Sequence, residues 1–191
     1  MFLKRAYPPL LALVVSISHT LATHAKQLEP GEYFLVDVPD ALNYHHVHSD
    51  QDRNLRISEF VPRGQNVNNW REMVTIMTFR GLRGVTARQF AERMIADADN
   101  ECATCSGELL QKGRLEGYRF ALTMLSVPRP ASGTSPEWNL GLVIRGKDSM
   151  YLVMKAWRQN PSPKDVTQWR SILSKARICD NRVKGVTCAT D

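Results

Sequence analysis

Three histidines fall within four positions of the chain, at His45, His46 and His48. In an extended segment alternate residues point to the same side, so His46, His48 and Asp50 would share one face. Imidazole and carboxylate groups are ligands that Zn²⁺ and Cu²⁺ accept. The spacing therefore suggests a weak zinc or copper site that needs a further ligand from elsewhere. The alternative is a solvated polar loop or edge strand, with no cofactor.

The four cysteines are Cys102, Cys105, Cys179 and Cys188, and an even number in an exported chain indicates disulfide bonds. We expect Cys102 to pair with Cys105 and Cys179 with Cys188; the alternative joins the two segments across the fold. A Cys-x-x-Cys pair could also exchange thiols and disulfides. Redox pairs of that kind lie at a helix N-terminus, whose dipole stabilises the thiolate. This pair is expected at the C-terminal end of a helix, beside Glu101, which favours a structural role.

Other residue patterns that carry chemistry are few. The sequence has no Gly-x-Ser-x-Gly elbow, and every histidine outside the N-terminal 25 residues lies in one short segment, so no catalytic residue is predicted. Trp157 and Arg158 end a predicted strand next to the loop at Pro161. Among the tryptophans, Trp157, together with Arg158, is the one that we expect at a binding surface. The remaining tryptophans are expected in the core.

The N-terminus has the layout of a secretory signal peptide: Lys4 and Arg5, an apolar run over residues 10–17, and small residues at Thr23 and Ala25. We expect residues 1–25 to be removed, with cleavage after Ala22 as the alternative. The apolar run is well short of the roughly 20 residues that cross a bilayer, so no membrane span is expected. The compartment predicted for the mature protein is the periplasm or the outside of a bacterial cell.

The charge of the chain argues against nucleic-acid binding. The net charge is +6, and removing the predicted signal peptide leaves 23 basic and 19 acidic residues, a net charge of +4. The arginines are scattered, and no aromatic residues alternate with them as single-stranded nucleic acids require. We therefore expect no nucleic-acid partner.

Apolar periodicity predicts an α+β fold, an antiparallel sheet of about six strands with two main helices packed against it. The first helix should begin at Thr86, capped with Gln89, and the second at Ser162 and Pro163. The His-rich segment is interpreted as a connection between the first two strands. Residues 26–191 should form one domain, and the expected strands are residues 33–38, 55–61, 70–79, 118 to before Pro128, 138–144 and 150–156.

Three short segments, residues 69–75, 146–151 and 156–158, resemble a pattern of small uncharacterised exported proteins of Gram-negative bacteria. The order of elements is also similar to the PsbP-like fold, an antiparallel sheet flanked by helices, and this resemblance implies a role in binding or assembly. We therefore expect an exported non-enzymatic binding or accessory module that contacts a protein partner through a sheet edge or the loop of residues 128–136. The alternatives are a metal-binding protein that uses the histidines, and a thiol–disulfide protein that uses Cys102 and Cys105.

Overall fold

The computed structural model describes residues 29–130, 133 and 135–188, and the predicted signal peptide lies outside these residues. Two helices, α1 (Ala87–Glu101) and α2 (Pro163–Leu173), and a short 3₁₀ turn, Asp40–Leu42, accompany the strands. The strands are β1 (Glu32–Leu35), β2 (Tyr44–Gln51), β3 (Leu55–Pro62), β4 (Glu72–Arg80), β5 (Ser106–Leu115), β6 (Tyr118–Val127), β7 (Glu137–Arg145), β8 (Ser149–Trp157) and β9 (Arg177–Asp180).

The α+β class is confirmed, but the number of strands is corrected. The main sheet has seven strands in the order β2-β3-β4-β8-β7-β6-β5, and every neighbouring pair is antiparallel. A second sheet pairs β1 with β9, so the strand expected at residues 33–38 is shorter and does not join the main sheet. The predicted hairpin of residues 138–156 is confirmed as β7 and β8.

The periodicity missed β9 and, in the main sheet, the two edge strands. The His-rich segment is not a connection but β2, and β5 follows the first helix directly. Each carries a β-bulge, at Val47 and at Leu110, where the register with the neighbouring strand shifts by one residue. A bulge breaks the alternation of apolar and polar residues, and edge strands tolerate polar side chains. The bulges and the polar side chains of the edge strands both remove the strict alternation from which strands were predicted.

Each helix begins at the cap residue that its sequence predicts, and both caps are capping boxes. The Thr86 hydroxyl accepts a hydrogen bond from the backbone N–H of Gln89, and the Gln89 side chain accepts one from the Thr86 N–H. Ser162 and Asp165 make the same reciprocal pair at α2, with Pro163 in the first turn. These caps satisfy backbone donors that the first turn of a helix leaves unpaired, which fixes where both helices start.

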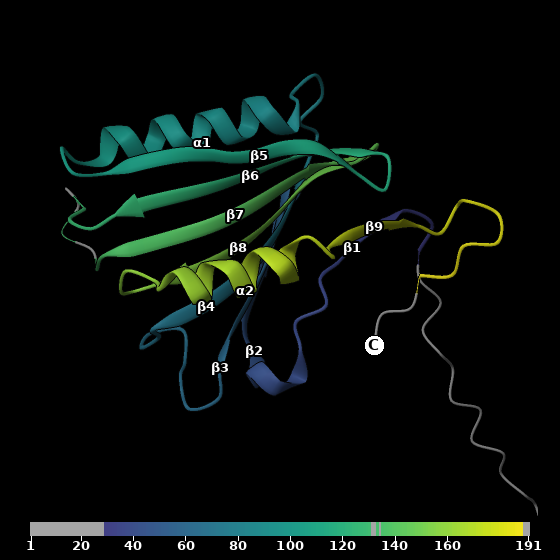
Figure 1. The fold of residues 1–191 in the computed structure, drawn as a ribbon. Coiled ribbons are helices and arrows are strands. Elements are labelled where there is room, and N and C mark those ends of the chain that lie inside the picture. Colours follow the sequence, from purple (N-terminus) through teal and green to yellow (C-terminus); the bar gives the residue numbers. More distant parts are fainter. Residues whose placement is uncertain (1–28, 131–132, 134, 189–191) are drawn as a thin grey trace, which may run out of the picture.

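The helices lie on opposite faces of the main sheet (Figure 1). Helix α1 packs on β5, β6 and β7, where Ala91 meets residues such as Val143. Helix α2 packs on the other face, where Trp169 and Leu173 join the larger core cluster with Leu142. Because α1 extends mainly over the β5 half, the β3–β4–β8 half of the same face has no helix of its own above it. That uncovered half-face is where the candidate site lies.

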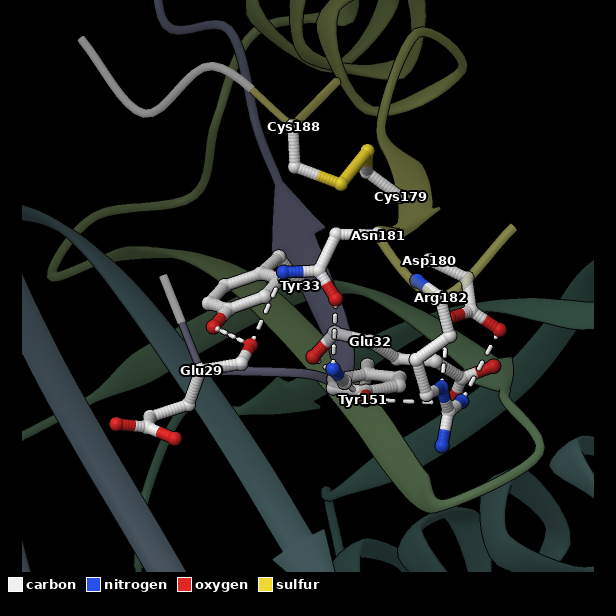
Figure 2. The surroundings of a disulfide bond; sticks show 10 residues. Glu29, Glu32, Tyr33, Tyr151, Cys179, Asp180, Asn181, Arg182 and Cys188 are labelled. Atoms are coloured by element: carbon white, nitrogen blue, oxygen red, sulfur yellow. Dashed lines mark hydrogen bonds and ion pairs between the residues drawn. A yellow bond between two sulfur atoms is a disulfide. The ribbon is translucent and has the colours of Figure 1, made fainter. Parts of the chain in front are cut away.

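The small β1–β9 sheet fastens the C-terminal segment to the main sheet (Figure 2). The carboxylate of Glu32 accepts hydrogen bonds from the backbone N–H groups of Lys147 and Asp148, both at 2.9 Å, in the turn between β7 and β8. Buried Asp180 accepts from Arg182 Nε at 2.7 Å and from Lys147 Nζ at 3.1 Å. These hydrogen bonds hold the pKa of the Asp180 carboxyl well below its usual range.

Candidate functional site

The structure does not bring the predicted metal ligands to one face. His46 pairs with Phe60 of β3, whereas His48 pairs with Glu59 and Asp50 with Ile57, because the bulge at Val47 lies between the histidines. Opposite residues of an antiparallel pair share a face, so His46 points away from the side that His48 and Asp50 share. The expectation of a common face is therefore wrong. Within the described part of the chain, no group of three or more His, Cys, Asp or Glu residues could hold a metal ion.

The expected disulfide bonds are confirmed. Cys102 is bonded to Cys105, with their Cα atoms 5.0 Å apart, and Cys179 to Cys188, with Cα atoms 5.7 Å apart. The first bond follows the last residue of α1, Glu101, as anticipated, so it lies at the negative end of the helix dipole. The second closes the C-terminal segment back onto β9 (Figure 2). The alternative pairing across the fold is excluded.

The two residues expected at a binding surface lie in different environments. Trp157 is only 5% exposed and belongs to the core beneath α2. Arg158, the next residue, stacks its guanidinium 3.7 Å from the ring centroid of Trp70 and forms an ion pair with Glu137 at 3.1 Å. It also donates to the backbone carbonyl of Ser135 at 3.2 Å. Arg158 therefore ties the start of β7 to the loop before β4, next to the uncovered half-face.

The most unusual polar group in the core is Lys155 of β8, which is 0% exposed. Its ammonium donates to the Tyr44 hydroxyl at 2.5 Å and to Glu72 Oε2 at 2.7 Å, and the Tyr44 hydroxyl donates to the same carboxylate oxygen at 3.1 Å. The ammonium also lies about 5 Å from the ring centroids of Tyr44, Trp157 and Trp169. One cation thereby links β2, β4, β8 and α2.

Burial controls the titration of this cluster. Desolvation lowers the pKa of Lys155 to about 8, and its hydrogen bond to Glu72 opposes that shift. Desolvation and the nearby Glu72 carboxylate raise the pKa of Tyr44 well above its usual range. A lysine with a lowered pKa can act as a base or nucleophile. Here the amine has no exposed surface and lines neither of the hollows described below, so its role is to hold the elements together.

The sequence contained a signal for Lys155 that periodicity analysis overlooked. Strand β8 is apolar on both faces, with Met150, Leu152 and Met154 alternating against Tyr151 and Val153. A single lysine inside such a strand needs a buried partner, because an isolated buried charge is costly. What the sequence did not reveal was which residues supply the partner.

Two adjoining hollows open on the α1 face of the sheet. The first, the helix hollow, has a volume of about 380 Å³ and lies between the C-terminal half of α1 and strands β6 and β7. The second, the sheet hollow, has a volume of about 270 Å³ and lies over β4 and β8. The side chain of Glu137 lines both. One bound segment could therefore contact both hollows.

Methionines contribute to the apolar lining of both hollows, above all of the sheet hollow. Met73 and Met77 of β4 and Met154 of β8 line the sheet hollow, and Met94 of α1 lines the helix hollow. Four of the seven methionines in the chain thus face this one region. Methionine is unbranched and polarisable, and it adapts to ligands of different shape. The sheet hollow is completed by Trp70 and Val67, and Val67 is 37% exposed.

A buried polar atom without a partner lies in the helix hollow. Asn139 is only 7% exposed, and nothing in the described part of the chain donates a hydrogen bond to its Oδ1 atom. Leaving a buried acceptor unpaired costs about 1–3 kcal/mol. Asn139 and Glu137 are alternate residues of β7, so both point to the α1 face. Asn139 therefore lines the hollow with an unsatisfied acceptor, which a ligand donor could reach if the atoms that bury Oδ1 move aside.

Comparison of the sequence with protein-family models gives no matching family, and comparison with curated proteins gives no match. Neither of the two helices that the structure describes is long and apolar enough to cross a membrane. The function of the protein is therefore inferred from the geometry of the two hollows.

Proposed function

We propose that this protein is an exported, non-enzymatic binding module that receives a segment of a partner protein in the helix and sheet hollows. The observation that supports this most strongly is the half-covered face itself. Helix α1 shields the β5 half, while Met77 and Met154 on the other half line an open hollow and are only partly buried. An apolar hollow with a few polar groups is typical of ligand sites.

This placement refines the expected contact surface. Sheet edges and the loop of residues 128–136 were the surfaces anticipated from the sequence. Residues 131, 132 and 134 of that loop lie outside the described part of the chain. Pro130 and Ser135, at the two ends of the loop, line the helix hollow. The proposed site therefore includes the described ends of the loop, and adds β4 and β8, which no sequence pattern singled out.

Export is the second part of the proposal. Two disulfide bonds support an oxidising compartment, because cytosolic proteins are normally kept reduced. The predicted signal peptide agrees with this, and the periplasm or the cell exterior is the compartment we propose. The resemblance to small exported proteins of Gram-negative bacteria, and to the PsbP-like fold, points in the same direction.

Site-specific photo-crosslinking in the producing cells tests the proposed docking surface. A photoreactive amino acid replaces Val67, which lines the sheet hollow and is 37% exposed. The matched control replaces Val186, which is 41% exposed and lies in the C-terminal segment, outside both hollows. We expect a discrete adduct from position 67, mapped by mass spectrometry to one segment of one partner, and none from position 186.

A second substitution shows whether the adduct depends on the hollow. Met154→Asp in the Val67 crosslinking background places a hydrated charge in the sheet hollow and should remove the adduct. Met77→Gln, a milder change in the same hollow, should weaken it if Met154→Asp disturbs folding, which circular dichroism reports. Equal adducts at positions 67 and 186, or an adduct that both methionine variants leave unchanged, would refute the proposed surface.

A further inference from the structure

The charges and the unpaired acceptor of the hollows indicate what kind of segment they bind. We infer that the occupant is a cationic segment of a partner protein, apolar residues of which contact the methionines while a lysine or arginine side chain donates a hydrogen bond to Asn139 Oδ1. This inference rests on the proposed function, and it adds the chemical class of the occupant.

The lining charges all have one sign. Asp97, Glu101 and Glu137 line the helix hollow, and Glu59 and Glu137 line the sheet hollow; among the described residues that line either hollow there is no lysine, arginine or histidine. The chain as a whole has a net charge of +6, so this acidic region contrasts with the rest of the protein. A surface of one sign favours encounter with a partner of the opposite sign.

Several of these carboxylates already have partners, which leaves the region acidic but not saturated. Asp97 pairs with Arg93 across one turn of α1, where both side chains are more than half exposed, and Glu137 pairs with Arg158. An exposed ion pair such as that of Asp97 with Arg93 is weak. Glu59 has no ion-pair partner among the residues that the structure describes. An incoming cation therefore meets at least one carboxylate without an ion-pair partner.

The Asn139 acceptor gives the second, independent reason. Asn139 lines the helix hollow, and nothing in the described part of the chain donates to its buried Oδ1 atom, so a ligand that reaches this atom with an N–H group removes an existing cost. Lysine and arginine side chains carry donors and no acceptor, and their long aliphatic stems suit an apolar hollow. A carboxylate-bearing ligand would instead place an acceptor against an acceptor. Asn139 and the lining carboxylates thus select the same ligand chemistry.

Three short labelled peptides that differ only in charge test the inference. They share alternating leucines, and the intervening positions carry lysine, glutamine or glutamate. Fluorescence anisotropy measures their affinities for the mature protein at low salt. We expect the lysine peptide to bind about tenfold more tightly than the glutamine peptide and to lose affinity as salt is added. The glutamate peptide should bind most weakly.

Two variants locate the effect. Asn139→Leu, which is close in volume and removes the acceptor, should weaken the lysine peptide about tenfold and the glutamine peptide less, because a neutral amide forms a weaker hydrogen bond than an ammonium. Glu59→Gln, at a partly exposed position in the middle of β3, reports on the charge alone if Asn139→Leu fails to fold. Glu108→Gln is the matched control, because Glu108 is exposed on β5 and lines neither hollow.

The outcomes separate this inference from the proposed function. Equal affinity of all three peptides, or a lysine peptide that both variants leave unchanged, overturns the cationic class. A specific adduct at position 67 together with no binding of the lysine peptide also overturns it, while the docking surface stands. The absence of that adduct overturns the docking surface itself.

Discussion

Replacing Lys155 by methionine should change how the stability of the protein depends on pH. The folded protein encloses the Lys155 ammonium among three aromatic rings, with Glu72 and Tyr44 as hydrogen-bond partners and Asp165 of α2 as a further negative charge nearby. Methionine keeps the length of the side chain and removes the titrating group. Glu72 remains hydrated in the variant because its side chain is 44% exposed.

The direction of the change in stability follows from the pKa values of Lys155 in the folded and the unfolded protein. The folded protein releases the Lys155 proton near pH 8, whereas the unfolded chain keeps it to about pH 10.5. Between these values the unfolded state binds more protons, so the free energy of unfolding rises with pH. Below about pH 8 both states are protonated, and the lysine contributes no slope. From about pH 7 to about pH 9.5 the predicted rise is about 2 kcal/mol relative to Lys155→Met.

The pH range of this prediction ends below the pH at which Tyr44 begins to lose its proton. Because the pKa of Tyr44 is raised in the fold, the unfolded chain would lose that proton first above about pH 10, and stability would then fall as pH increases. Urea unfolding followed by tryptophan fluorescence, at several pH values in the window, measures the difference. Lys164→Met, at an exposed position of α2, controls for loss of a positive charge. Parallel stability curves for wild type and Lys155→Met would refute the account of this cluster.

Three further substitutions test other parts of the fold by urea or thermal unfolding. Thr86→Ala removes the α1 cap and should cost about 1 kcal/mol, whereas no loss would mean that the capping box does not stabilise the helix. Gly107→Ala should destabilise by about 1–3 kcal/mol, because an added Cβ would lie 2.8 Å from the Cα of Ile95 in α1; an unchanged midpoint would contradict this close approach. The double variant Cys179→Ser, Cys188→Ser should lose about 2–3 kcal/mol by opening a short loop, and equal stability with and without reductant in the wild type would contradict it.

Local patterns predicted much of the fold. The starts of both helices, the β7–β8 hairpin and the two disulfide bonds depend on residues that are close in the sequence, and the structure confirms them. The edge strands β2 and β5 were not predicted, because a bulge at Val47 and another at Leu110 shift the alternation of apolar and polar residues. The bulge in β2 also explains why His46 does not share a face with His48.

The candidate site was harder to predict, because its residues come from distant parts of the chain. Asn139 and Glu137 are polar positions in an otherwise apolar strand, and this was a signal available in the sequence. The sequence could not show that Met94 of α1 and Met77 of β4 would line the same region, since that depends on how far α1 extends over the sheet. Trp157 was expected at a binding surface but is buried beneath α2, because its burial depends on how the sheet and α2 are assembled.

Methyl NMR of the methionines tests the proposed docking surface most directly. With ¹³C-methyl methionine in the mature protein, Met77 and Met154 report on the sheet hollow and Met94 on the helix hollow. Met124, on the opposite face of β6, packs with the α2 core cluster and serves as the internal control. Saturating lysine peptide should shift the methyl signals of Met77, Met94 and Met154 and leave Met124 in place. Signals of the three lining methionines that stay fixed while the peptide binds would place the binding surface elsewhere and contradict the account.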